Sequence, residues 1–128
     1  MSNLNTIITV KARENMAKGR AGMLTMPTIT GMAFGDGGVD GQGVPIAPAE
    51  NATALTHELM RKALTSATAI SATTIEYKCT LSTSELAGED INEIALYDSN
   101  GDLAIIKTFV TKAKGNDEVL TFAINDVF

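Results

Sequence analysis

The chain has 128 residues, one cysteine and a net charge of −5 from 10 basic and 15 acidic residues. A chain of this length buries roughly two thirds of its unfolded surface without help from a disulfide or a metal, and its acidic balance argues against a phosphate backbone as partner. The sequence shows neither a leader pattern nor an apolar run of bilayer length, so we expect a protein made in the cytoplasm, with no nucleic-acid partner and no membrane insertion.

The first predicted element is a short helix at about residues 9–20, where apolar residues form a weak helical stripe. Thr9 can serve as the N-cap, and Gly19 or Gly22 lies where the helix is expected to end. Basic residues cluster on this segment, and we interpret them as a solvated face.

A strand and a long loop come next. Residues 28–34 alternate and are rich in threonine, which favours a strand. Residues 35–51 cannot hold a regular ladder because glycines and prolines crowd them: Gly35, Gly37, Gly38, Gly41, Gly43, Pro45 and Pro48. A loop of this length tends to be functional, so we expect a partner contact here.

The segment after this loop has two possible structures. Its apolar residues recur at helical spacing behind Thr53, which is either a helix cap or a strand residue: Leu55, Leu59, Met60, Ala63 and Leu64. A helix and an extended arm both remain open. On a helix, Glu58 and Arg61 would form a modest ion pair.

The rest of the chain predicts an antiparallel sheet. Residues 73–81 alternate apolar and polar, and within this strand Cys79 is expected to pack as a small buried hydrophobe. Ser82 and Glu85 match a capping box, which predicts one helical turn at residues 82–88. The last strand is expected at residues 119–124.

Asn100-Gly101 predicts a two-residue type I′ hairpin turn between strands 91–97 and 103–110, pairing Leu96 with Ile105 and Tyr97 with Ala104. Both faces of this hairpin are then apolar, so both must be covered. The second cover is either the helix and the Leu55 segment, or another subunit. The two predicted faces are Ile94, Leu96, Leu103, Ile105, Phe109 and Ala95, Tyr97, Ala104, Ile106, Val110.

Together these elements predict one α+β domain over residues 1–128. Its short N-terminal helix packs on a mainly antiparallel β-sheet or sandwich, and a long glycine-rich loop interrupts the order.

Known chemical signatures are not matched. The run GDGGVDG lacks the spacing, lysine and helix of a phosphate loop, so its glycines are interpreted as serving tight turns in a flexible loop. Counting from Asp98, an EF-hand would need a glycine and a glutamate where Leu103 and Phe109 stand. His57 is the only histidine and has no nucleophile elbow to serve. We predict no catalytic residue, no metal site and no cofactor.

Four acidic residues precede the hairpin, namely Glu85, Glu89, Asp90 and Glu93. Paired carboxylates hydrolyse glycosides, but such sites also need an aromatic-lined cleft, and this chain has no tryptophan, two tyrosines and four phenylalanines. We therefore interpret the acidic run as a solvated edge.

Three segments in order, ITGMAFGDGG, ALTHELMRKAL and INEIALYDSNGDLAIIKTF, resemble the N-terminal domain of phage tail-collar fibre proteins. In that family a strand enters an A-x-G-D-G turn, a T-L-x-x-E-x-x-R segment follows, and an E-I-x-L-Y/F-D hairpin comes last. The matching positions are Ala33, Gly35, Asp36, Gly37, Leu55, Glu58, Arg61, Glu93, Ile94, Leu96, Tyr97, Asp98, Gly101, Asp102 and Leu103.

The resemblance implies a structural part of a phage or phage-like tail, joining a fibre to the baseplate or collar among other tail proteins. It implies a homo-oligomer, with a trimer favoured, located in the particle after synthesis in the bacterial cytoplasm. The alternative is a small carbohydrate- or ligand-binding module on the host-facing side, and a hydrolase using His57 is a third hypothesis. The candidate partner interface is Gly35, Asp36, Gly37, Gly38, Ala95, Tyr97 and Ile106.

Overall fold

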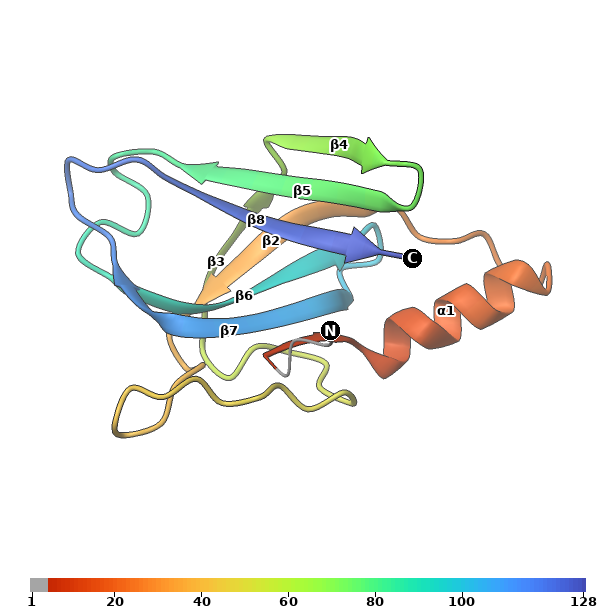
Figure 1. Cartoon of the computed structure of the whole chain (residues 1–128), viewed down its shortest axis with the longest axis horizontal. Helices are drawn as coiled ribbons and strands as arrows, with labels where there is room; N and C mark the ends of the chain where they lie inside the picture. Colours follow the sequence, from red (N-terminus) through yellow and green to blue (C-terminus); the bar gives the residue numbers. More distant parts are fainter. Residues whose placement is uncertain (1–4) are drawn as a thin grey trace.

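The structure, a computed structural model, describes residues 5–128, which form one helix and two antiparallel sheets (Figure 1). The five-stranded sheet has the order β1-β7-β6-β2-β3, and the three-stranded sheet has the order β4-β5-β8. The predicted α+β class, with one short helix and mainly antiparallel strands, is confirmed. The elements are β1 (Thr6–Ile8), α1 (Val10–Arg20), β2 (Ile29–Gly35), β3 (Glu58–Ala63), β4 (Ser66–Ser71), β5 (Thr74–Leu81), β6 (Asp90–Asp98), β7 (Leu103–Ala113) and β8 (Leu120–Val127).

The main core contains side chains from both sheets. The Phe34 ring of β2 meets the Phe122 ring of β8 edge to face, with 5.4 Å between ring centroids. Cys79 is a fully buried free thiol, as its alternating strand predicts. The buried members of this core are Met32, Phe34, Cys79, Leu81, Ile91, Ile94, Leu96, Ile105, Phe122 and Ile124.

A second apolar cluster lies on the other face of the five-stranded sheet, under the chain that links β2 to β3. Its buried members are Ala33, Leu55, Ala95, Leu103 and Ile106. Residues 36–57 contain no helix or named strand, only an isolated bridge between Val39 and Pro45. Of the two covers that the sequence offered from within the chain, the Leu55 segment therefore covers this face.

Helix α1 does not cover the sheet. Its predicted N-cap is confirmed, because Thr9 Oγ1 accepts a hydrogen bond from the Ala12 N–H at 3.1 Å and donates to the Leu103 carbonyl at 2.8 Å. Beyond this start the helix projects past the end of the sheets (Figure 1), and only Ala12 and Asn15 of its residues are buried. The expectation of a helix packed along the sheet is thus wrong for its last two turns.

The β6–β7 hairpin differs from its predicted turn. Leu96 does pair with Ile105, but Tyr97 pairs with Leu103, not with Ala104. The Asp98 carboxylate accepts hydrogen bonds from the Asn100 and Asp102 N–H groups, and Gly101 alone of the turn residues has a positive φ, of 82°. A three-residue loop with a glycine bulge therefore replaces the type I′ turn, and the shift moves Leu103 to the second cluster.

Four further segments correct or complete the predictions. The segment with two possible structures contains strand β3, so Glu58 and Arg61 form their ion pair on a strand. Residues 82–88 hold turns without a helix, although the Ser82 N–H does donate to Glu85 Oε1 at 2.8 Å. Strands β1 and β4 were not predicted.

Candidate functional site

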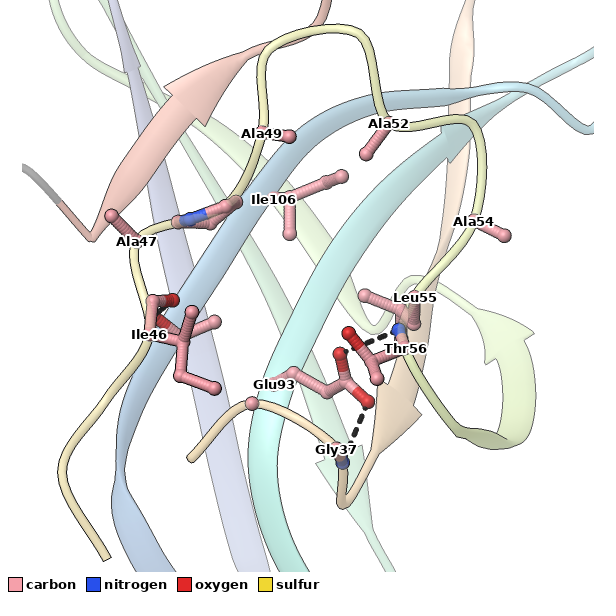
Figure 2. Close-up of a pocket in the computed structure, with 13 residues that line it drawn as sticks. Gly37, Ile46, Ala47, Ala49, Ala52, Ala54, Leu55, Thr56, Glu93 and Ile106 are labelled. Atoms are coloured by element: carbon pink, nitrogen blue, oxygen red, sulfur yellow. Dashed lines mark hydrogen bonds between the residues drawn. The ribbon is translucent and has the colours of Figure 1, made fainter. Parts of the chain in front are cut away.

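The two ends of the 36–57 segment meet at one carboxylate, that of Glu93 on β6. Its oxygens accept hydrogen bonds from the backbone N–H groups of Gly37 at 2.8 Å, Thr56 at 3.0 Å and His57 at 2.9 Å. Figure 2 shows the carboxylate between Gly37 and Thr56. Glu93 is only 2% exposed. The prediction of a solvated acidic edge is therefore wrong for Glu93, because this acid is buried and anchors the loop.

Asn92, the neighbour of Glu93, anchors the same loop. Its Oδ1 accepts from the Gly38 N–H at 2.7 Å, and its Nδ2 donates to Thr111 Oγ1 at 3.2 Å. Successive side chains of a regular strand point to opposite faces. Here the β6–β7 register shifts between Ile91 and Glu93, and such an irregularity lets two consecutive polar side chains reach one loop.

Three glycines at the start of the loop are needed for close approach. A Cβ at Gly35 would lie 2.5 Å from Glu93 Oε2, one at Gly37 would lie 2.7 Å from the Thr56 Cβ, and one at Gly38 would lie 2.5 Å from the Asn92 carbonyl oxygen. None of the three has a positive φ. The prediction that they serve flexible turns is corrected: their missing side chains let the backbone reach its anchors.

His57 and Asp36 form an exposed pair beside these anchors. His57 Nδ1 lies 2.5 Å from Asp36 Oδ1. The hydrogen bond and the charge of Asp36 raise the pKa of the imidazole, and the charges of Glu93 and Glu89 act in the same direction. The pair links residues that precede and follow the loop, as the Glu93 hydrogen bonds do.

A second set of contacts joins β3 to the hairpin turn. The Arg61 guanidinium donates two hydrogen bonds to Glu58 and one to the Gly101 carbonyl at 3.0 Å, and it lies 5.0 Å from the centroid of the Tyr97 ring. The Tyr97 ring covers Gly31, where a Cβ would lie 2.1 Å from it. Arg61 thereby fastens three elements of the five-stranded sheet.

A pocket of about 270 Å³ lies between the loop and the sheet (Figure 2). Its lining is mostly apolar, and two of its polar side chains have partners within the chain: Glu93 accepts the loop N–H groups, and Thr108 donates to the Ile46 carbonyl at 2.8 Å. The other lining residues are Gly37, Gly38, Ala47, Pro48, Ala49, Ala52, Ala54, Leu55, Thr56 and Ile106. The Glu93 carboxylate, which is the titratable side chain in this lining, is thus occupied by the loop and not free to act on a ligand.

Within residues 5–128, no group of three or more His, Cys, Asp or Glu side chains is arranged to hold a metal ion. The same residues include no helix that is long and apolar enough to cross a membrane.

The residues of the candidate partner interface fall into two settings. Gly35 and Gly38 are buried, and Asp36 and Gly37 are half-buried, at the anchored start of the loop. On the β6–β7 hairpin, Ala95 and Ile106 are buried under the loop, and Tyr97 is half-buried against Arg61. All three belong to or pack against the second apolar cluster. The structure contains no partner, so the interface stays a prediction.

Glu93 and Asn92 are the site residues that sequence reasoning missed. One signal could have revealed Glu93. It shares strand parity with Ala95 and Tyr97, which were already predicted to face a cover. An acid on a covered face needs donors, and the glycine loop offers backbone N–H groups.

Comparison with known proteins gives one match. The family model described as phage tail-collar fibre protein, N-terminal, matches residues 1–122. No curated protein and no solved structure matches the chain.

Proposed function

Because this chain belongs to the phage tail-collar fibre protein family, we propose that it attaches a tail fibre, or forms part of one, at the baseplate or collar of a phage or phage-like tail. The family makes the chain a structural component of the virion tail that associates with other tail proteins. The attachment to the baseplate or collar is the step that we add.

The observation that carries this proposal is that the polar side chains at the loop bind the backbone of their own chain. Glu93, the most buried acid of the site, binds three backbone N–H groups of its own chain. A catalytic acid or base must instead reach the reacting atoms of a substrate. The residues that match the family motifs also contact neighbouring strands and loops of the same chain, as Gly35, Gly37, Arg61 and Tyr97 do. This supports a structural role without catalysis.

We also propose that the chain works as a homo-oligomer, with a trimer favoured by analogy with the family. Support comes from large apolar side chains on the surface. Met23 is 76% exposed, Phe128 is 69% exposed and Val110 is 68% exposed. Such residues gain from burial against a neighbouring subunit.

The test is to locate the chain in purified particles. We expect an antibody against the chain to label the tail where a fibre joins the baseplate or collar, and the fold to fit density there in electron microscopy. Particles made without the chain should lack the fibre, and the wild-type chain supplied in trans should restore it. Label on the distal fibre tip, or no label on particles, would overturn the attachment role.

A further inference from the structure

The two ends of the molecule carry opposite charge. Helix α1 (Val10–Arg20) has four basic residues and one acidic residue, a net charge of +3. Two acids lie beside it, because Glu50 pairs with Arg13 and Asp126 lines a pocket with Ala12 and Met16, and they reduce the net charge of this end to +1. The segments 82–90 and 112–119, which form the turns and the adjoining strand ends, have five acidic residues and two lysines, a net charge of −3. One of these acids, Glu85, pairs with Lys62 of β3, which reduces the net charge of this end to −2. Figure 1 shows α1 at one end of the longest axis and both turns, β5 to β6 and β7 to β8, at the other. We call these the helix end and the turn end.

Much of this charge has no ion-pair partner among the described residues. At the helix end, Lys11 and Arg20 form no ion pair, while Arg13 pairs with the exposed Glu50 and Lys18 with Glu14. At the turn end, no ion pair involves the exposed acids Glu89, Asp90, Asp117 and Glu118. Lys114 does not face solvent there, because it is 1% exposed and donates to the Thr83 and Gly115 carbonyls.

Apolar side chains accompany the charge at both ends. A shallow groove of about 480 Å³ at the helix end is lined by Met16, Gly19, Arg20, Met26 and Phe128. Met26 is 47% exposed and Phe128 is 69% exposed. At the turn end, Val119 is 56% exposed. A contact between the two ends would therefore bury apolar surface and bring opposite charges together.

We propose that the helix end of one copy docks on the turn end of a second copy of this chain. Two helix ends, or two turn ends, would place like charges together, so the charges oppose a two-fold contact between matching ends. A head-to-tail contact closes into a ring if the rotation between copies permits it, and a ring of three is one such closure. The inference rests on the homo-oligomer proposed above and not on where in the particle the chain lies.

The first test measures self-association of the purified full chain by sedimentation equilibrium. Raising the salt from about 50 mM to about 500 mM shortens the screening length severalfold. We expect the association to weaken at least tenfold over this range. A chain that stays monomeric in low salt at high protein concentration would overturn the proposal, as would an oligomer that is indifferent to salt.

Charge reversal assigns the contact to the two ends. We expect Lys11→Glu with Arg20→Glu to abolish association in low salt, and Glu89→Lys with Asp117→Lys to do the same. The four substitutions in one chain exchange the two signs and should restore it. Lys78→Glu, on the exposed surface of β5, is the control and should change little.

Melting temperature shows whether each variant is folded. If the quadruple variant does not fold, a mixture of the two double variants provides the rescue, because a contact between one copy of each variant pairs opposite charges. Two variants cannot alternate around a ring of three, so recovery is measured as association of one double variant with the other. Recovery in either experiment supports the contact. Folded variants that associate like wild type, or that fail to recover in both experiments, overturn it.

The outcomes also separate this inference from the proposed function. A monomeric chain that labels the tail correctly would overturn head-to-tail docking and leave fibre attachment intact. If that monomer lost its place in the particle on Lys11→Glu with Arg20→Glu, the occupant of the helix end would be another tail protein. Self-association by a chain that is absent from particles would leave the contact standing and overturn the attachment.

Discussion

The anchored loop and helix α1 differ in how regular their backbone is and in how firmly they are attached to the core. Residues 36–57 lack regular structure, yet Glu93 and Asn92 hold their backbone through four hydrogen bonds from loop N–H groups. Helix α1 is regular, yet only Ala12 and Asn15 of its residues are buried. Regularity of the backbone and attachment to the core are thus separate properties in this molecule, and the irregular segment is the better attached.

The family motifs follow the same division. Gly35, Gly37, Glu93, Arg61 and Tyr97 match the motifs, and all lie in the anchored loop or the contacts beside it. None of the matched positions lies in α1. The motif residues therefore maintain the scaffold, and the head-to-tail contact proposed above uses a helix that none of them holds in place. A substitution in the anchored region should therefore change the stability of the fold more than a similar substitution in α1.

The largest expected effect is that of Glu93→Ala. It leaves three part-buried loop N–H groups without their charged acceptor. Hydrogen bonds to charged groups contribute about 1.5–3 kcal/mol each, and water can replace part of this, so we expect a loss of about 3 kcal/mol in the free energy of unfolding. Urea denaturation measures this loss. The matched change is Glu14→Ala on α1, which removes only an exposed ion pair with Lys18 and should cost far less. Equal losses for the two would contradict the comparison.

Two glycine-to-alanine changes should have opposite effects on the stability of the fold. At Gly38 the new Cβ would lie 2.5 Å from the Asn92 carbonyl, so backbone must shift and we expect a loss of about 1–3 kcal/mol. At Gly19 in α1 the nearest atoms lie at 3.7 Å, an ordinary contact, and alanine should stabilise the helix by about 0.5–1 kcal/mol. Melting temperatures show whether each variant is more or less stable than the wild type. A stabilising Gly38→Ala would show that the loop accommodates a side chain at this position.

Arginine gives the next comparison. Arg61→Ala removes an ion pair, a hydrogen bond to the Gly101 carbonyl and the contact with the Tyr97 ring, for an expected loss of about 1–2 kcal/mol. Arg13→Ala removes only an ion pair with Glu50 in which both side chains are about half exposed or more, and we expect less than about 1 kcal/mol. Urea midpoints rank the two, and a larger loss at Arg13 would contradict the attachment argued for Arg61.

The sequence predicted best those elements whose own residues determine their structure. The α1 cap at Thr9 is a local hydrogen bond, and the alternation of β5 places Cys79 and Leu81 in the core. Strand β4 was missed because its small, uncharged residues are exposed on both faces and give no period to detect. Strand β1 has three residues, which is too short for any pattern.

The site was less predictable because distant residues create it. Nothing near Glu93 in the sequence shows that Gly37 and Thr56 will bring N–H groups to it. The hairpin turn shows a similar limit at short range. Asn100-Gly101 favours a type I′ turn, but the Asp98 side chain accepts two N–H groups of the turn and stabilises a longer loop. The family motifs include Glu93 and Gly37 but not Asn92 or Thr56, and they do not reveal these contacts.

The smallest expected effect concerns pH and the exposed pair beside the anchors. Hydrogen bonding to Asp36 raises the pKa of His57 above its ordinary value of 6.5. A raised pKa in the folded state means that the pair stabilises the fold fully below the unfolded pKa, and that this contribution is lost as the pH rises through the folded pKa. His57 is the only histidine, so its ring proton signals in NMR titrate without overlap from another imidazole. Asp36→Asn should lower the pKa of His57 and remove the fall in stability that accompanies loss of the imidazole proton, while Asp40→Asn, in the same loop, should leave both unchanged. Because the His57 ring is exposed, the fall should be small beside the loss from Glu93→Ala, and a pKa of His57 that does not respond to Asp36→Asn would separate this pair from the attachment of the loop.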